Sequence, residues 1–218
     1  MFLKGLSLLL LGVGVFVLMQ VILPFLAYQI WEITAYDKSQ ILTDPAPVSL
    51  SGDLIGSNIL GVSVENIDNF PAFIAGNKIM VPYAEFKLSV PKLGLSDITV
   101  KVASNDFEYT LAHLPGTNLP GERGNVFITG HSSLSFTPGS KKKAYFANLH
   151  QIKIGDEVLV EAVGQKFKYI VEGMKIVDPK DTSVILPPDK MGRYLSLMTC
   201  VPPGFNTKRL IVLARLKS

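Results

Sequence analysis

"RYLSLMTCVPPGFNTKRLIVLARL" (residues 193–216) contains two runs of large apolar residues separated by a Pro-Pro-Gly sequence. Consecutive prolines lack the N–H groups that a sheet requires, so the chain must leave the sheet after the first run. We therefore expect two strands, 193–200 and 209–216, with Cys200 at the end of the first and Arg209 at the start of the second. If the two strands are neighbours, the short connection brings Cys200 and Arg209 close together.

Further short strands are expected from residue 83 onward. Runs rich in β-branched and aromatic residues occur at 86–93, 97–103 and 124–131, and two more flank the turn at Gly164-Gln165. The stretch NDFEYTLAHLPGT (105–117) is expected to contain a short helix. Helices of about 10–15 residues do not alternate with these strands, which argues against a doubly wound α/β fold. The pattern predicts an all-β domain, a barrel or a sandwich, with one or two short helices.

The first thirty residues form a separate segment. From Gly5 to Ile30 no residue is charged, and a helix of about 20 apolar residues is enough to span a bilayer. Lys4 precedes this segment and acidic residues follow it, which places the N-terminus in the cytoplasm and the rest of the chain outside the cell. A cleaved signal peptide and a buried core helix are the alternatives. We expect three parts: a signal-anchor transmembrane helix at 1–31, an extracellular stalk or extension at 32–82 and a folded β-domain at 83–218.

The composition limits the possible classes of function. The chain has 218 residues, of which 48% are hydrophobic and 18% charged, so it is too apolar for an intrinsically disordered protein. Its formal net charge is +3 and no basic block accounts for it, so nucleic-acid binding is not expected. The single cysteine excludes an intramolecular disulfide framework. In an exported chain such a cysteine is a small buried side chain, a reactive thiol or a partner in an intermolecular disulfide.

Three residues at strand ends are candidates for chemistry. Cys200 ends one expected strand, and His131 ends another, directly after a glycine that lets a ligand or a second backbone segment approach closely. A cysteine nucleophile needs a neighbouring group that exchanges its proton, and His131 is the best placed of the three histidines. Arg209 is either a group that stabilises an oxyanion or a rim arginine. We interpret His113 and His150 as structural side chains.

With these residues in place, the chain resembles the sortases, the membrane-anchored cysteine transpeptidases of bacterial cell surfaces. The resemblance implies an eight-stranded sortase-type barrel over the β-domain, with Cys200 as the nucleophile, His131 as the catalytic histidine and Arg209 as the catalytic arginine. Thr199 matches a position that lines the family's substrate site. The family's TLxTC signature is changed here by Ser196 in place of its first threonine. Four stretches carry the likeness, in chain order: FKLSVPKLGLSDITV, LAHLPGTNLPGERGNVFITGHSS, SLMTC and NTKRLIV.

The resemblance also implies a reaction. Cys200 would cleave the Thr–Gly bond of a C-terminal LPxTG-like sorting signal of a surface protein, and the thioester would pass to an amine of a peptidoglycan precursor or to a pilin lysine. No cofactor and no metal ion is expected. The nine-residue spacing from Cys200 to Arg209 resembles the short-loop classes C, D and E, and the subclass stays open. A catalytically inactive sortase-like binding or scaffold domain and a cysteine hydrolase are the alternative functions.

Overall fold

A computed structural model of the chain describes residues 9–19, 22–23, 26, 30, 62–67, 70–75, 81–132, 143–203 and 207–217. The chain divides into two units, Met1–Gln40 and Ile41–Ser218. In the first unit, residues 9–19 form an α-helix whose apolar side chains are exposed. Among the described residues, no helix is both long and apolar enough to cross a membrane. Much of the expected span at 1–31, and residues 32–61 of the expected extension, lie outside the described residues.

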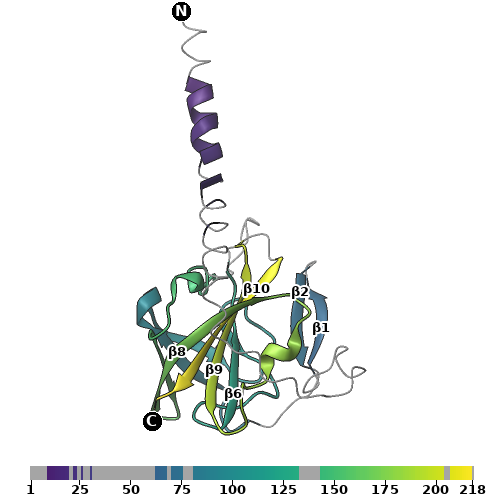
Figure 1. Ribbon diagram of the computed structural model, residues 1–218, viewed down its shortest axis with the longest axis vertical. Coiled ribbons are helices and arrows are strands. Elements are labelled where there is room, and N and C mark those ends of the chain that lie inside the picture. The colour runs from purple at the N-terminus through teal and green to yellow at the C-terminus, as the bar shows by residue number, and fades with distance from the viewer. Residues whose placement is uncertain are drawn as a thin grey trace, which may run out of the picture. The chain divides into compact units, whose positions relative to one another are not determined.

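The larger unit contains a closed barrel of eight strands in the order β10-β8-β7-β3-β4-β5-β6-β9 (Figure 1). This confirms the all-β, eight-stranded prediction, although the described part of the domain has three short helices in place of one or two. The strands are β3 (Glu85–Val90), β4 (Leu95–Lys101), β5 (Leu111–His113), β6 (Gly124–Thr129), β7 (Glu157–Ala162), β8 (Gln165–Val177), β9 (Arg193–Val201) and β10 (Lys208–Leu216). The short helices are the 3₁₀-helices η2 (Pro91–Leu93), η3 (Leu149–Gln151) and η4 (Thr182–Ile185).

Two local features differ from the expectations. The predicted helix within 105–117 is wrong, because its first half is an irregular connector and Leu111–His113 form β5. This segment is a strand because its buried residues pair with β4 on one side and β6 on the other, and such pairing overrides local propensity. Within the expected extension, β1 (Val62–Ile67) and β2 (Phe70–Ala75) form an antiparallel hairpin that was not predicted.

The apolar runs of β9 and β10 are continuous because both faces of these strands are buried. Along β10, Leu210 and Val212 alternate with Ile211 and Leu213, and all four side chains are buried. A strand with one solvated face would alternate apolar and polar residues. Part of the second face is covered by the β8–β9 connection, whose Ile185 packs against residues of β6, β8, β9 and β10.

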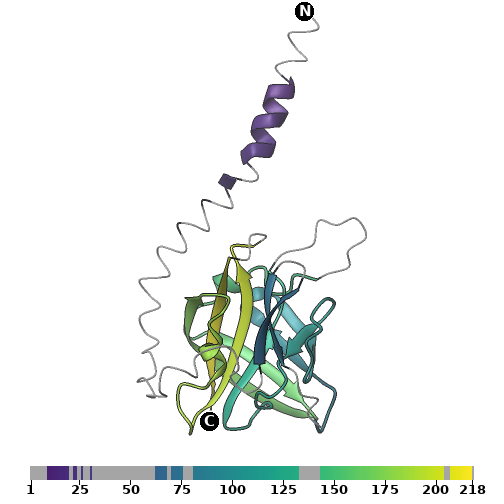
Figure 2. The ribbon, with the colours of Figure 1, turned by 90° about the vertical axis from the view of Figure 1, so that its right-hand side faces the viewer.

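The strand directions bring three strand ends to one edge of the barrel. β6 and β9 are parallel, so both end at the same edge, and β10 begins there because it is antiparallel to β9. Since β8 and β9 both flank β10 and run parallel to each other, their connection must cross from one edge to the other, which takes about a dozen residues or more. Figure 2, turned by 90°, shows the strands curving around to close the barrel.

Candidate active site

Cys200 and Arg209 lie directly opposite each other on β9 and β10. Residues opposite one another on antiparallel strands project to the same face, with Cβ atoms about 4.5–5.5 Å apart. Arg209 is only 2% exposed and its Nη1 donates a hydrogen bond to the carbonyl of Lys208 at 3.0 Å. The prediction that the two strands are neighbours, with Cys200 close to Arg209, is therefore confirmed. The catalytic roles of Cys200 and Arg209 stay predictions.

The free thiol of Cys200 is partly exposed in an environment that disfavours its charged form. Burial raises the pKa of the Cys200 thiol, and the positive charge of Arg209 acts in the opposite direction. Because burial is the larger effect, the thiol form predominates near neutral pH. A nucleophilic role for Cys200 consequently requires a neighbouring group that takes up the thiol proton.

His131 follows the end of β6 and is level with Cys200 on the neighbouring strand β9. The last registered pair of the parallel β6–β9 ladder is Thr129 with Met198. His131 lies two residues after Thr129, and Cys200 lies two residues after Met198. Parallel pairing therefore delivers the histidine and the cysteine to the same edge of the barrel, beside the start of β10 that carries Arg209.

The backbone around His131 is held by β9 and by a later segment of the chain. Gly130 donates its N–H to the carbonyl of Met198 at 3.2 Å, and its own carbonyl accepts a hydrogen bond from Thr199 Oγ1 at 2.8 Å. The carbonyl of His131 accepts the N–H of Phe146 at 3.1 Å. Thr199, expected to line the substrate site, is buried and binds the residue that precedes His131; its role toward substrate stays a prediction.

Phe107 is a neighbour of the site that sequence analysis missed. Its ring lies against the His131 ring, with centroids 4.7 Å apart and planes inclined at 52°. Phe107 belongs to the irregular connector between β4 and β5, where Lys101 and Asp106 form an ion pair at 2.7 Å. The sequence shows only an isolated aromatic residue in a polar stretch, and nothing local indicates its contact.

An apolar strip lies on the Cys200 face of the barrel, meaning the face of β6, β9 and β10 onto which Cys200 and Arg209 project. Met198 is two residues from Cys200 and Ile211 two from Arg209, so both project to this face. Ile185 of η4 packs against them. The strip consists of Phe127, Val177, Met198 and Ile211.

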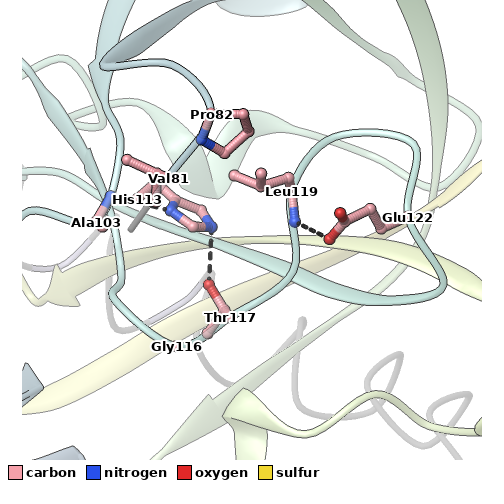
Figure 3. A pocket seen from close by; sticks show the side chains of 8 residues that line it. All are labelled: Val81, Pro82, Ala103, His113, Gly116, Thr117, Leu119 and Glu122. Atoms are coloured by element: carbon pink, nitrogen blue, oxygen red, sulfur yellow. Dashed lines mark hydrogen bonds between the residues drawn. The ribbon is translucent and has the colours of Figure 1, made fainter. Parts of the chain in front are cut away.

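The other two histidines have structural positions. His113 is buried beside a pocket of about 190 Å³ (Figure 3). Its Nδ1 accepts the N–H of Ala103 at 3.3 Å, so Nε2 carries the proton and donates to the carbonyl of Asn118 at 2.9 Å. Burial lowers the pKa of His113 and likewise that of His150, which lies in η3.

Comparisons with known proteins relate the barrel domain to one family. The family model for the sortase domain matches residues 88–217. The chain is 25% identical over 126 residues to sortase A of Bacillus anthracis, a match that covers 58% of this chain and 56% of that protein, so it spans just over half of that relative. Among solved structures, it is similar to a lid mutant of sortase A from Corynebacterium diphtheriae, with 28% identity, a TM-score of 0.55 and coverage of 62% of this chain and 71% of that chain. It is similar also to the pilus-related sortase C of Group B Streptococcus, with 28% identity, a TM-score of 0.55 and coverage of 64% and 70%.

Proposed function

We propose that this chain, which belongs to the sortase family, is a cysteine transpeptidase that cleaves an LPxTG-like sorting signal and transfers the acyl group to an amine. The observation that carries the proposal is the placement of Cys200 directly opposite Arg209, at the barrel edge to which β6 delivers His131. The guanidinium of Arg209 is buried and faces a partly exposed thiol, so a positive charge lies beside the sulfur. Acyl transfer at the sulfur develops a negative charge that this cation would stabilise.

In the proposed reaction, the sulfur of Cys200 attacks the carbonyl carbon of the Thr–Gly peptide bond. The thiol proton passes to His131, which delivers it to the nitrogen of the departing glycine as the C–N bond breaks. A thioester between Cys200 and the substrate threonine remains. An amine then attacks this thioester, forms the new amide bond and restores the thiol of Cys200.

Arg209 stabilises the negative charge that develops on the substrate carbonyl oxygen. The guanidinium offers five N–H donors in a rigid plane, and here it is positioned before the substrate arrives because its backbone is part of the β10 ladder. Donors that are prearranged in a site with little water stabilise an oxyanion more strongly than water does.

The apolar strip supports a substrate with apolar residues before the scissile bond. The strip itself is buried beneath η4, so the leucine and proline of an LPxTG-like signal would meet its border at η4, where the partly buried Val184 packs against the strip, while the threonine carbonyl reaches Cys200. The acceptor is an amine of a peptidoglycan precursor or a pilin lysine. Which of these two acceptors is used decides the subclass within the family.

The test is a transfer assay with the full-length chain in detergent. An LPxTG peptide is supplied with either triglycine or a lysine-containing pilin peptide, and Cys200→Ala is run in parallel. Transfer product from the wild type alone supports the proposal, and release of free acid as the main product would indicate a hydrolase. Absence of product and of free acid with every sorting peptide would favour a binding or scaffold domain.

Membrane anchoring with the catalytic domain outside the cell is part of the same proposal. It is supported by the uncharged segment from Gly5 to Ile30 and by the exposed apolar helix at 9–19, since a helix that is apolar all round needs apolar surroundings. The chain should remain in the membrane fraction after alkaline carbonate washing. Release into the carbonate supernatant would contradict an integral anchor.

A further inference from the structure

A buried polar link connects the barrel to the β8–β9 connection. Asn125 on β6 is 1% exposed and Ser196 on β9 is 0% exposed. Ser196 Oγ donates to Asn125 Oδ1 at 3.0 Å, and Asn125 Nδ2 donates to the carbonyl oxygen of Ile185 at 3.0 Å. Burial of these polar atoms costs free energy unless they are hydrogen-bonded, so the three groups depend on one another.

The link ends at η4, which covers the apolar strip. Ile185 is the last residue of η4, and its side chain packs against the strip while its carbonyl is held by Asn125. The connection starts at Asp178, directly after Val177, which is the partner of Arg209 on β8. Any displacement of η4 would therefore change the space along the strip beside Cys200 and Arg209.

Apolar packing alone does not define where η4 sits on the strip. Burial of apolar surface is non-directional, so it does not by itself select one position along the strip. A hydrogen bond from the amide of Asn125 has a preferred distance and direction, and it fixes one position. Ser196 completes the arrangement, because its donated hydrogen bond favours the amide orientation that places Nδ2, and not Oδ1, toward the carbonyl of Ile185.

We infer that Asn125 is a positioning residue that, together with Ser196, holds η4 over the apolar strip and so sets the affinity for the apolar part of the substrate. The inference rests on the proposed function for its substrate, and on the hydrogen bonds of Asn125 for its mechanism. The hydrogen bonds of Asn125 connect β6 to η4. Cys200 and Arg209 pair further along β9 and β10 and take no part in these hydrogen bonds. Loss of the link should thus weaken peptide binding and leave the chemistry at Cys200 intact.

The test compares Asn125→Asp and Ser196→Ala with two controls in the full-length chain. Asn125→Asp keeps the shape but replaces the donor that faces Ile185 by an oxygen, and Ser196→Ala removes the hydroxyl. Ser196→Thr keeps the hydroxyl and should keep the wild-type KM, while its free energy of unfolding reports what the added methyl group costs at this buried position. Tyr169→Phe removes a buried hydroxyl of β8 that accepts the N–H of Gly121, outside the β8–β9 connection, and should leave substrate affinity unchanged.

We expect the KM for an LPxTG peptide to rise by roughly 3- to 10-fold in Asn125→Asp and Ser196→Ala, as the loss of one net hydrogen bond predicts. The kcat and the rate of Cys200 alkylation by iodoacetamide should stay at wild-type values. Amide hydrogen exchange in η4 should become faster in both variants, while Ser196→Thr and Tyr169→Phe keep the wild-type KM and exchange.

Three results separate the possibilities. Unchanged KM and unchanged η4 exchange in folded variants would overturn the inference, as would a fall in kcat at constant KM. If Asn125→Asp does not fold, the milder Ser196→Ala decides the matter by the same measurements. If the wild type turns over no sorting peptide, the proposed function fails, whereas the exchange rates still show whether Asn125 and Ser196 hold η4.

Discussion

The exit of β6 is packed so closely that Gly130 has no room for a side chain. A Cβ atom at Gly130 would lie 2.5 Å from Cδ2 of Leu111 and 2.8 Å from Cδ2 of Phe146, whereas ordinary contacts begin at 3.4 Å. Both neighbours are fully buried, and so they cannot swing into solvent. An alanine at this position must therefore displace its surroundings by about 1 Å, and the next residue along the chain is His131.

The cost of Gly130→Ala follows from this displacement. Overpacking of a closely packed site destabilises a protein by about 1–3 kcal/mol. A shift of about 1 Å in a catalytic group can lower the rate by about 100-fold. We expect Gly130→Ala to lower the free energy of unfolding in urea by about 1–3 kcal/mol and to lower kcat/KM for transpeptidation by about 100-fold.

A second glycine provides a control of similar stability cost. Gly164, in the β7–β8 turn, has a φ of 73° and no atom within 4 Å of an added Cβ. Gly164→Ala should cost about 1–2 kcal/mol through backbone strain alone and should keep wild-type kcat/KM where the protein is folded. Wild-type kcat/KM in Gly130→Ala, or an equal loss in both variants, would refute the reasoning that packing at Gly130 positions His131.

Three further predictions follow from the site and its histidines. The rate of Cys200 alkylation by iodoacetamide should rise with pH into the alkaline range, because burial raises the pKa of the thiol. Arg209→Ala removes the positive charge that opposes this effect, so the pH profile of alkylation should move to higher pH. A shift of the profile to lower pH would contradict this account. Arg209→Lys keeps the charge but not the planar set of donors, and kcat should fall by about 100- to 1,000-fold while circular dichroism shows an intact fold; near-normal turnover would remove Arg209 from the catalytic residues. Burial lowers the pKa of His113, so the folded chain binds fewer protons than the unfolded chain below the ordinary histidine pKa of about 6.5, and stability should decrease as the pH falls through that range. His150 contributes with the same sign, and His113→Gln should reduce the loss of unfolding free energy between pH 7.5 and 5.5; an unchanged loss would assign it to other groups.

Local sequence was sufficient for the parts of the site that lie at strand ends. The Pro-Pro-Gly break between two apolar runs defined β9 and β10, and their register then placed Cys200 opposite Arg209. The glycine before His131 marked a close approach, and Leu111 and Phe146 do lie too near for a side chain there. In both cases the physical cause, a missing N–H or a missing Cβ, is a property of the residue itself.

Long-range partners could not be predicted in this way. Leu111–His113 form a strand because β4 and β6 flank them, and the contact of Phe107 with His131 depends on the same arrangement. The hydrogen bonds of Asn125 reach partners 60 and 71 residues away, and no local pattern encodes that choice. Ser196 was visible only as a departure from a family signature, without its partner.

The most direct test of the central claim is the intact mass of the full-length chain after incubation with an LPxTG peptide in the absence of an amine acceptor. The account predicts an increase equal to the peptide fragment that ends at threonine, located on Cys200 by peptide mapping, removed by hydroxylamine and absent from Cys200→Ala. A wild-type chain that alkylates normally yet forms no such adduct, or an adduct that persists in Cys200→Ala, would contradict it.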